Sequence, residues 1–302
     1  MLETAHSLSV DLLAAEVVSA FRSRAIRSIL LKGPSITRWL YSDGEHRPYG
    51  DCDLLVPPGQ AGDAQDVLLS LGFRYGFESS GPGELEEDLF WTRGRDTVDL
   101  HVTLHGARAN PARVWSALSE RVECETVGGC DMDVLTSDAR AMQVALHVAH
   151  HGRREPVPMR DLERALETLP LDVWERAAVL SDDLDAIPAF AAGLSLLPAG
   201  QAIVDRLGIE KDRSVKGLLS AETAPTVAFT IEELRTARGV FAKAVLVVRK
   251  AFPNRTYMRL YWPRARRGRL GLVAAHCQRI ASKARQLLPA LIAWNRARRA
   301  SR

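Results

Sequence analysis

A chain of 302 residues that is 46% hydrophobic and 25% charged has the composition of a globular protein, with room for one large or two moderate domains. The four cysteines show no C-x-x-C spacing, which favours reduced thiols in a cytoplasm and disfavours a disulfide framework or a zinc site. No basic segment precedes an apolar run at the N-terminus, and no uncharged run is long enough to span a bilayer. We therefore expect neither a signal peptide nor a transmembrane segment.

The net charge of +3 hides an uneven distribution. Residues 1–233 hold 22 Lys/Arg and all 37 Asp/Glu, a balance of −15, whereas residues 234–302 hold 18 Lys/Arg and no acid. The two parts of the chain are therefore predicted to face different partners.

Apolar spacing in the first part of the chain predicts alternating helices and strands. A helix is expected over residues 8–25, a short buried strand at 28–31, and a second helix over 34–42. Pro34 suits the first turn of that second helix, because the N–H that proline lacks would have no intrahelical partner there. A strand, a helix and a strand follow at 52–56, 61–72 and 73–77. An acidic loop over 78–88 then leads to two hairpins, 89–104 around Gly94 and 121–135 around Gly128 and Gly129.

Strand signals fade after about residue 136, and helical patterns replace them. Helices are expected at 137–151, 159–169, 171–181, 184–197, 199–207, 230–250 and 270–297. We therefore predict an α+β fold, with an α/β domain at residues 1–136 and a helical domain at residues 137–302 that ends in a basic segment.

Two aspartates stand one residue apart in "DCDLLV", at the start of an apolar strand. Side chains alternate faces along a strand, so Asp51 and Asp53 are expected on one side, and Asp99 in "TVDLHV" has the same setting. If the two strands are neighbours, three carboxylates converge and repel one another unless cations neutralise them. Hard oxygen ligands of this kind suit Mg²⁺ or Mn²⁺.

These residues resemble the nucleotidyltransferase superfamily, which has the polymerase-beta-like fold, and most closely a group of uncharacterised bacterial nucleotidyltransferases. The resemblance rests on "LLKG", "DCDLLV" and "VDLH" in this order and covers roughly residues 25–170. It implies a mixed sheet with flanking helices, a phosphate-binding turn at Gly33 and Ser35, and a metal site made by Asp51, Asp53 and Asp99.

The activity that the resemblance implies is transfer of a nucleotidyl group from an NTP, such as ATP, to a hydroxyl acceptor, with release of pyrophosphate. Two divalent ions would assist, and Asp99 would bind or activate the acceptor. The chain departs from the superfamily in its turn, because Pro34 separates Gly33 from Ser35. The interval from Gly33 to Asp51 is also long.

Cationic residues beside the proposed site are candidates for binding the triphosphate. Lys32 and Arg47 are the stronger candidates and Arg38 the weaker, and each has the alternative of being an ordinary surface charge. His101 falls on the same strand face as Asp99, where it would orient a carboxylate or a phosphate or serve as a structural histidine.

Histidines end the helix predicted at 137–151. His147 and His151 lie four residues apart and could share a ligand with Asp161, but without a convincing third ligand zinc is disfavoured. The resemblance implies instead that His147, His150 and Asp161 couple the helical domain to the active site.

Acidic residues at the same spacing elsewhere show that spacing alone proves little. Such pairs are Asp43/Glu45, Glu84/Glu86, Glu123/Glu125 and Asp131/Asp133. Asp131 and Asp133 also precede an apolar pair, but no strand, glycine turn and helix lead to them, so we expect them on a hairpin surface.

The acid-free C-terminal segment mixes arginine with Tyr257, Tyr261 and Trp262. It is suited to an anionic partner such as nucleic acid, lipid or an acidic protein, or to packing against the acidic part of this chain. The acceptor is left open between a small molecule such as a sugar or antibiotic, a protein and RNA. One alternative for the whole protein is a non-catalytic nucleotide-binding regulatory or scaffold protein. Another is a basic-helix module that associates with nucleic acid or a membrane and carries the α/β domain as an accessory, and a further one is a toxin-like enzyme that modifies tRNA.

Overall fold

The structure is a computed structural model, and it describes residues 2–42, 45, 47–75, 88–152, 155–210, 214–221, 224–253, 255, 258–259 and 262–301. The chain divides into two compact units. Unit 1 comprises residues 1–78 and 87–210, and unit 2 comprises residues 79–86 and 211–302.

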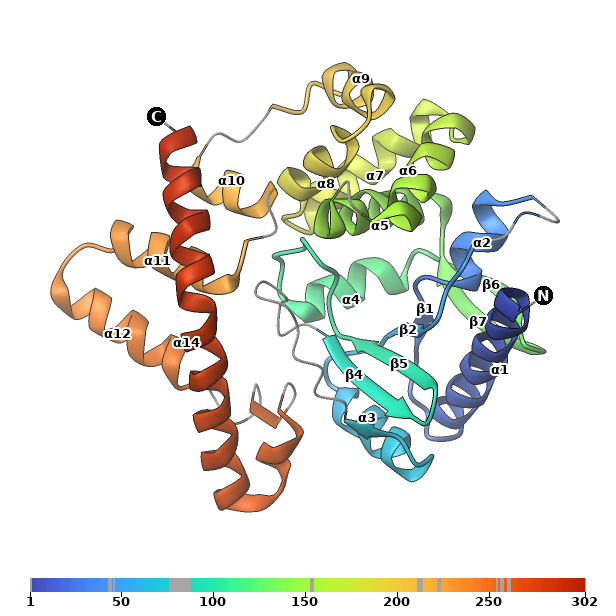
Figure 1. The fold of residues 1–302 in the computed structure, drawn as a ribbon, viewed down its shortest axis with the longest axis horizontal. Coiled ribbons are helices and arrows are strands. Elements are labelled where there is room, and N and C mark those ends of the chain that lie inside the picture. The colour runs from blue at the N-terminus through green and yellow to red at the C-terminus, as the bar shows by residue number, and fades with distance from the viewer. Residues whose placement is uncertain are drawn as a thin grey trace. The chain divides into compact units, whose positions relative to one another are not determined.

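One mixed sheet of seven strands lies in unit 1 (Figure 1). Its spatial order is β3-β4-β5-β2-β1-β7-β6. The strands are β1 (Ile29–Leu30), β2 (Cys52–Leu55), β3 (Arg74–Tyr75), β4 (Asp88–Arg93), β5 (Asp96–His101), β6 (Val122–Val127) and β7 (Cys130–Leu135). The pairs β2·β5 and β1·β7 are parallel and the other neighbours are antiparallel, so the predicted α+β class with a mixed sheet is confirmed.

Both predicted hairpins are present. The β4–β5 turn contains Gly94 at φ +61°, and the β6–β7 turn contains Gly128 at +58° and Gly129 at +80°. Side-chain-bearing residues rarely adopt this left-handed region, which is why glycine marked both turns in the sequence. The acidic loop expected over 78–88 lies almost wholly outside the described residues.

Nine helices are described in unit 1. They are α1 (Leu2–Ser23), α2 (Pro34–Leu40), α3 (Ala61–Ser70), α4 (Pro111–Ser119), α5 (Ser137–His151), α6 (Pro156–Thr168), α7 (Leu171–Asp183), α8 (Ile187–Leu194) and α9 (Pro198–Arg206). All but α4 were predicted, with ends that differ by a few residues. The helix α4 begins where Asn110 caps it, its side chain accepting a hydrogen bond of 2.9 Å from the Arg113 N–H.

Alternation along the central strands divides the buried side chains between the two faces of the sheet. Ile29 and Leu55 belong to a core that also includes buried residues of α2 and of α4 to α9. Leu30 and Leu54 are buried too, and with opposite alternation they face the other side. Helix α1 packs on β2, β6 and β7, and also contacts α3. The central strands are thus covered on both faces.

Unit 2 is helical in its described part. Its elements are α10 (Val215–Ala221), α11 (Thr226–Thr236), α12 (Val240–Ala251), the short 3₁₀ helix η1 (Pro263–Arg266) and the long α14 (Gly268–Ala300). The single helix predicted over residues 230–250 is wrong, because Gly239, at φ +84°, separates α11 from α12. The helix predicted at 270–297 is confirmed as α14.

The change from strands to helices falls between β7 and α5, where the sequence predicted it. As a boundary between domains, the division at residues 136 and 137 stays a prediction. Within the described part of the chain, every helix is too short or too polar to cross a lipid bilayer. The cytoplasmic location also stays a prediction.

Candidate active site

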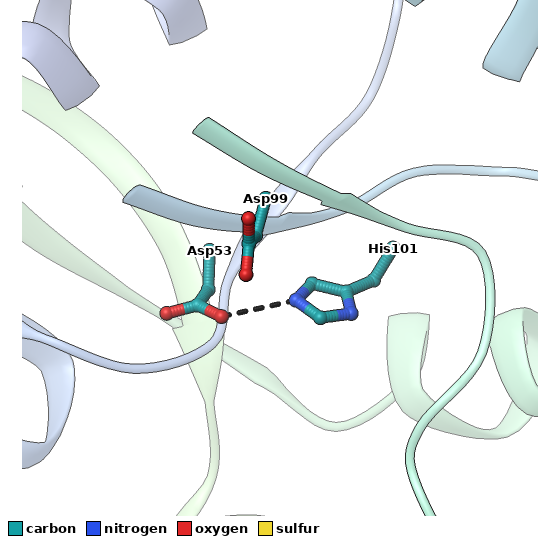
Figure 2. A group of neighbouring side chains, drawn as sticks. All are labelled: Asp53, Asp99 and His101. Carbon is teal, nitrogen blue, oxygen red and sulfur yellow. Dashed lines mark hydrogen bonds and ion pairs between the residues drawn. The ribbon is translucent and has the colours of Figure 1, made fainter. Parts of the chain in front are cut away.

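Asp53 and Asp99 are direct register partners on the neighbouring parallel strands β2 and β5. His101 follows two residues later on the same face of β5. Figure 2 shows the three side chains converging, and one ligand atom from each lies within 4.8 Å of the others. This is the one such group of His, Cys, Asp or Glu among the described residues. The expectation that the two acidic strands are neighbours is therefore confirmed.

Asp53 is the most enclosed of these three residues, at 2% exposure. Its Oδ1 lies 2.6 Å from the Lys32 Nζ and 3.0 Å from the His101 Nε2. Burial acts to raise the pKa of Asp53, but the charge of Lys32 and the hydrogen bond from His101 lower it by more, so the net shift is downward. Asp53 is therefore held as an anion.

Asp51 stands immediately before β2 and is half-buried. The negative charge of Asp53, followed by burial, raises the pKa of Asp51 to about 6. The two carboxylates thus repel one another in the absence of a cation. The ligand atoms that lie within 4.8 Å of one another belong to Asp53, Asp99 and His101. The sequence had led us to expect Asp51 in this group and not His101.

Gly33 and Ser35 lie where the chain passes from β1 to α2. They directly follow Lys32, whose ammonium contacts Asp53. Gly33 has φ +63° and caps α2, and Pro34 occupies the first turn of the helix as expected. The Ser35 side chain is fully buried, and its hydroxyl has no hydrogen-bond partner among the described residues. A buried hydroxyl without a hydrogen-bond partner lowers the stability of the folded protein. Ser35 is therefore a candidate for hydrogen bonding to a ligand or a water.

Arg47 does not extend freely toward a phosphate. It is 4% exposed, and it donates hydrogen bonds of 2.8 and 2.7 Å to the two carboxylate oxygens of Asp161 on α6. Tyr41 donates a third, of 2.8 Å, to the same carboxylate. This buried network joins the segment before β2 to helix α6. The coupling role expected of Asp161 stays a prediction. Arg38 is directed elsewhere, to Asp11 and the Thr126 carbonyl.

Histidines extend the site toward α5. The His105 ring, in the loop after β5, stacks on His150 with centroids 4.0 Å apart and meets His101 edge-on at 6.2 Å. His147 contacts His151 at 4.6 Å. Burial, and then the charge of Lys32, hold the pKa of His147 well below its usual value. No zinc-like group forms here among the described residues.

His105 was missed by sequence reasoning. Its position four residues beyond His101 was the signal available, and nothing in the pattern places it against α5. It links His101, and through it Asp53, with the histidines that end α5.

The described members of the other acidic pairs have structural partners. The Thr126 hydroxyl lies 2.6 Å from Asp131, and Asp133 lies 3.5 Å from Arg27, both on the β6–β7 hairpin as predicted. Glu123 and Glu125 both pair with the buried Arg140. Asp43, Glu84 and Glu86 lie outside the described residues.

Of the aromatic residues noted in the basic segment, Trp262 is buried at the start of η1. Tyr257 and Tyr261 lie outside the described residues. Trp262 is therefore not available to an external partner in this structure.

Paired aspartates on parallel neighbouring strands, beside a glycine turn that opens a helix, define a site of the nucleotidyl-transferring class. Residues 3–198 match the family described as uncharacterised nucleotidyltransferase, and the chain belongs to this family. It is accordingly a nucleotidyltransferase.

Two solved structures of an antibiotic-resistance factor are similar to this chain. The solution structure of the antibiotic-resistance factor ANT(2″)-Ia is 16% identical with a TM-score of 0.44, over 60% of this chain and 96% of that chain. The crystal structure of ANT(2″)-Ia in complex with adenylyl-2″-tobramycin is 15% identical with a TM-score of 0.40, over 57% and 97%. No curated protein matches the chain.

Proposed function

We propose that the protein transfers a nucleotidyl group from an NTP to a hydroxyl acceptor in a reaction that depends on divalent metal ions. The observation that carries this proposal is the direct pairing of Asp53 with Asp99 on β2 and β5, with a ligand atom of His101 within 4.8 Å. In the reaction, the acceptor oxygen forms a bond to the α-phosphorus while the bond to the β-phosphate oxygen breaks. Pyrophosphate leaves, and the hydroxyl gives up its proton.

The donor set fits a divalent cation. Asp53 is held as an anion although it is buried, and Asp51 and Asp53 repel one another, so a cation would relieve both costs. Asp51, Asp53 and Asp99 would hold Mg²⁺ or Mn²⁺, two ions in all. Bound there, the ions would offset the negative charge that develops on the phosphate oxygens.

Lys32 and the turn after it would position the nucleotide. The Lys32 ammonium neutralises Asp53 in the structure, and once that carboxylate is bound to a cation, the ammonium can pair with a phosphate oxygen. The unpartnered hydroxyl of Ser35 and the backbone at Gly33 supply donors to the same triphosphate. Arg47 acts indirectly, by fixing the segment before β2 through Asp161.

Asp99 would serve the acceptor. It lies beside Asp53 in register and is less enclosed, so an incoming hydroxyl can approach it while the nucleotide occupies the side of Lys32 and the turn. Asp99 would bind that hydroxyl or draw off its proton. His101, bonded to Asp53 at 3.0 Å, would hold the carboxylate in position.

The test uses each α-³²P-labelled NTP with Mg²⁺ or Mn²⁺ and a cell extract separated into small-molecule, protein and RNA fractions. We expect one fraction to become labelled and pyrophosphate to be released. Label in small molecules, protein or RNA would identify the acceptor class, and label in tRNA would favour the toxin-like alternative.

Matched variants make the test specific. Asp53→Asn should abolish labelling, whereas Asp133→Asn, an exposed aspartate with a similar local sequence on β7, should label as the wild type does. Nucleotide binding without any transfer, in the presence of every fraction, would support the non-catalytic alternative and sink the proposal.

A further inference from the structure

Large hydrophobic side chains are exposed mainly in unit 2. Among the described residues, thirteen of the seventeen exposed large hydrophobic side chains lie between residues 240 and 292. Scattered exposed hydrophobic residues are normal on a globular protein, but a concentration of them marks an interaction surface.

Helix α12 exposes an apolar face. Val240 is 85% and Phe241 83% exposed, and Val245 and Val248 are exposed with them. At 3.6 residues per turn these four positions share one side of the helix. Leu246, on the opposite side, is half-buried. Helix α12 therefore packs through one narrow edge and leaves a broad apolar side uncovered.

Contacts with α11 and α14 position helix α12 within unit 2. Lys250 pairs with Glu233 of α11 at 3.0 Å. Arg279 of α14 donates a hydrogen bond of 2.8 Å to the Lys250 carbonyl, which satisfies an acceptor at the C-terminal end of α12. The remaining basic side chains of α12, Lys243 and Arg249, are exposed on the two flanks of the apolar side.

Helix α14 carries a second uncovered stripe. It spans 33 residues, and its exposed apolar side chains recur mostly at intervals of three or seven residues, which places them on one side of the helix. These side chains are Leu270, Val273, Ile280, Leu287, Leu288, Leu291 and Ile292. Its opposite side packs with α10 and α11, where Ala290 and Ala297 are buried.

The charge of this region has one sign. Residues 234–302, which include α12, η1 and α14, contain 18 Lys/Arg and no Asp or Glu. Helices that combine exposed apolar side chains with basic residues, and that have no acidic residues of their own, are typical of proteins that lie on anionic lipid surfaces. We propose that unit 2 binds the surface of a membrane rich in anionic phospholipid through the apolar sides of α12 and α14.

A nucleic acid or a second copy of this chain would suit either the basic or the apolar side chains of this surface, but not both. A nucleic acid would neutralise the arginines but leave the valines, leucines and Phe241 in water. A second copy of this chain would cover the apolar sides but bring the same positive charges together. An anionic bilayer takes both groups, because acyl chains receive the apolar residues and phosphate headgroups receive the basic ones.

The proposal is tested by flotation of the full-length protein with two kinds of vesicle, phosphatidylcholine alone and phosphatidylcholine with phosphatidylglycerol in equal parts. We expect binding to the anionic vesicles that weakens with added salt, and little binding to the neutral ones. Phe241→Gln with Val248→Gln should weaken binding by at least about tenfold, since two apolar side chains no longer leave water. Lys243→Gln with Arg249→Gln should weaken it about fivefold per charge and reduce its salt dependence.

The control is Leu12→Gln with Val179→Gln, two equally exposed apolar residues of unit 1, which should bind vesicles as the wild type does. Absence of binding to anionic vesicles at low salt would overturn the proposal, as would wild-type binding by the Phe241/Val248 variant. Binding of poly(U) RNA that the Lys243/Arg249 variant loses and the Phe241/Val248 variant keeps, without vesicle binding, would assign the surface to nucleic acid. A dimer that only the Phe241/Val248 variant abolishes, again without vesicle binding, would assign it to a second copy.

Discussion

Arg47 and Asp161, 114 residues apart in the chain, form a bidentate ion pair in the interior of unit 1. Both side chains are almost fully buried, and the Tyr41 hydroxyl completes the hydrogen bonding of the carboxylate. The segment that leads into the Asp51–Asp53 strand is therefore fixed to α6. Arg47, which the sequence suggested for the nucleotide, makes this connection.

Breaking this pair should destabilise the protein strongly. Asp161→Leu leaves Arg47 buried without its counter-charge, and we expect the free energy of unfolding to fall by about 3–5 kcal/mol. The double variant Arg47→Met with Asp161→Leu should recover most of that loss, because it removes both buried charges. Urea unfolding measures both. Asp172→Asn, which breaks the exposed Arg176 pair on α7, should cost far less. An equally small loss from Asp161→Leu would contradict the structural role.

A side chain at Gly33, in the turn before α2, should destabilise the protein. A Cβ at Gly33 would lie 3.3 Å from the Tyr49 ring, which a hydrogen bond of 2.7 Å to Asp11 holds in place. Gly94 has a similar φ of +61° but open space around it. Gly94→Ala should therefore cost about 1 kcal/mol for its backbone alone, and Gly33→Ala clearly more, by urea unfolding. Equal losses would show that Tyr49 moves aside.

Local patterns predicted most of the elements that build the site. Apolar alternation and glycine turns marked the β4–β5 and β6–β7 hairpins, and Pro34 marked the start of α2, because each depends on only a few adjacent residues. The pairing of Asp53 with Asp99 was conditional in the sequence, since strand order depends on contacts between distant segments. The structure supplied that order by placing β2 beside β5.

Two contacts could not be seen in the sequence because their partners are distant in the chain. These are the pairing of Arg47 with Asp161 and the stacking of His105 on His150, which lies on another element. Helix α4 was missed although Asn110 and Pro111 form a recognisable start. Gly239 fell inside the single helix predicted over residues 230–250, whereas in the structure α11 ends at Thr236 and Gly239 caps the start of α12.

Ser35→Ala should separate stability from nucleotide binding. Removing a buried hydroxyl that has no protein partner should leave the free energy of unfolding unchanged or raise it by about 1 kcal/mol. If the hydroxyl contacts a phosphate, NTP affinity measured by calorimetry should fall about tenfold. Ser195→Ala removes another buried unpartnered hydroxyl, outside the turn, and should not alter NTP affinity. Unchanged affinity in Ser35→Ala would remove Ser35 from the phosphate site.

Asp51 should make the metal-free protein less stable as the pH rises. Its pKa is raised from 3.8 to about 6 by Asp53 and by burial, so the folded protein binds this proton more tightly than the unfolded chain. The free energy of unfolding should therefore fall as pH rises through that window and stay lower above it. In EDTA at pH 7, Asp51→Asn should be more stable than the wild type by an amount on the order of 1 kcal/mol, and its loss of stability between pH 4 and 6 should be smaller. A wild-type pH profile in Asp51→Asn would exclude this repulsion.

Substitution of Asp53 and substitution of Asp99 should impair nucleotide binding and turnover to different extents. Asp53 lies between Lys32 and His101, on the side of the Gly33 turn, whereas Asp99 lies on the neighbouring strand β5 and is proposed to serve the acceptor. Asp53→Asn should therefore lose metal-dependent NTP binding together with turnover. Asp99→Asn should bind Mg²⁺–NTP within a few-fold of the wild type yet lose turnover by roughly a hundredfold or more, the scale of a missing general base.

Calorimetry with a non-hydrolysable NTP, with and without Mg²⁺, measures the first quantity, and release of labelled pyrophosphate measures the second. Asp133→Asn provides the matched control, because it removes an exposed carboxylate from β7 and should leave both quantities unchanged. If Asp99→Asn lost nucleotide binding as completely as Asp53→Asn, the two carboxylates would share one metal-binding role. The division between a nucleotide side and an acceptor side would then fail, even with nucleotidyl transfer itself intact.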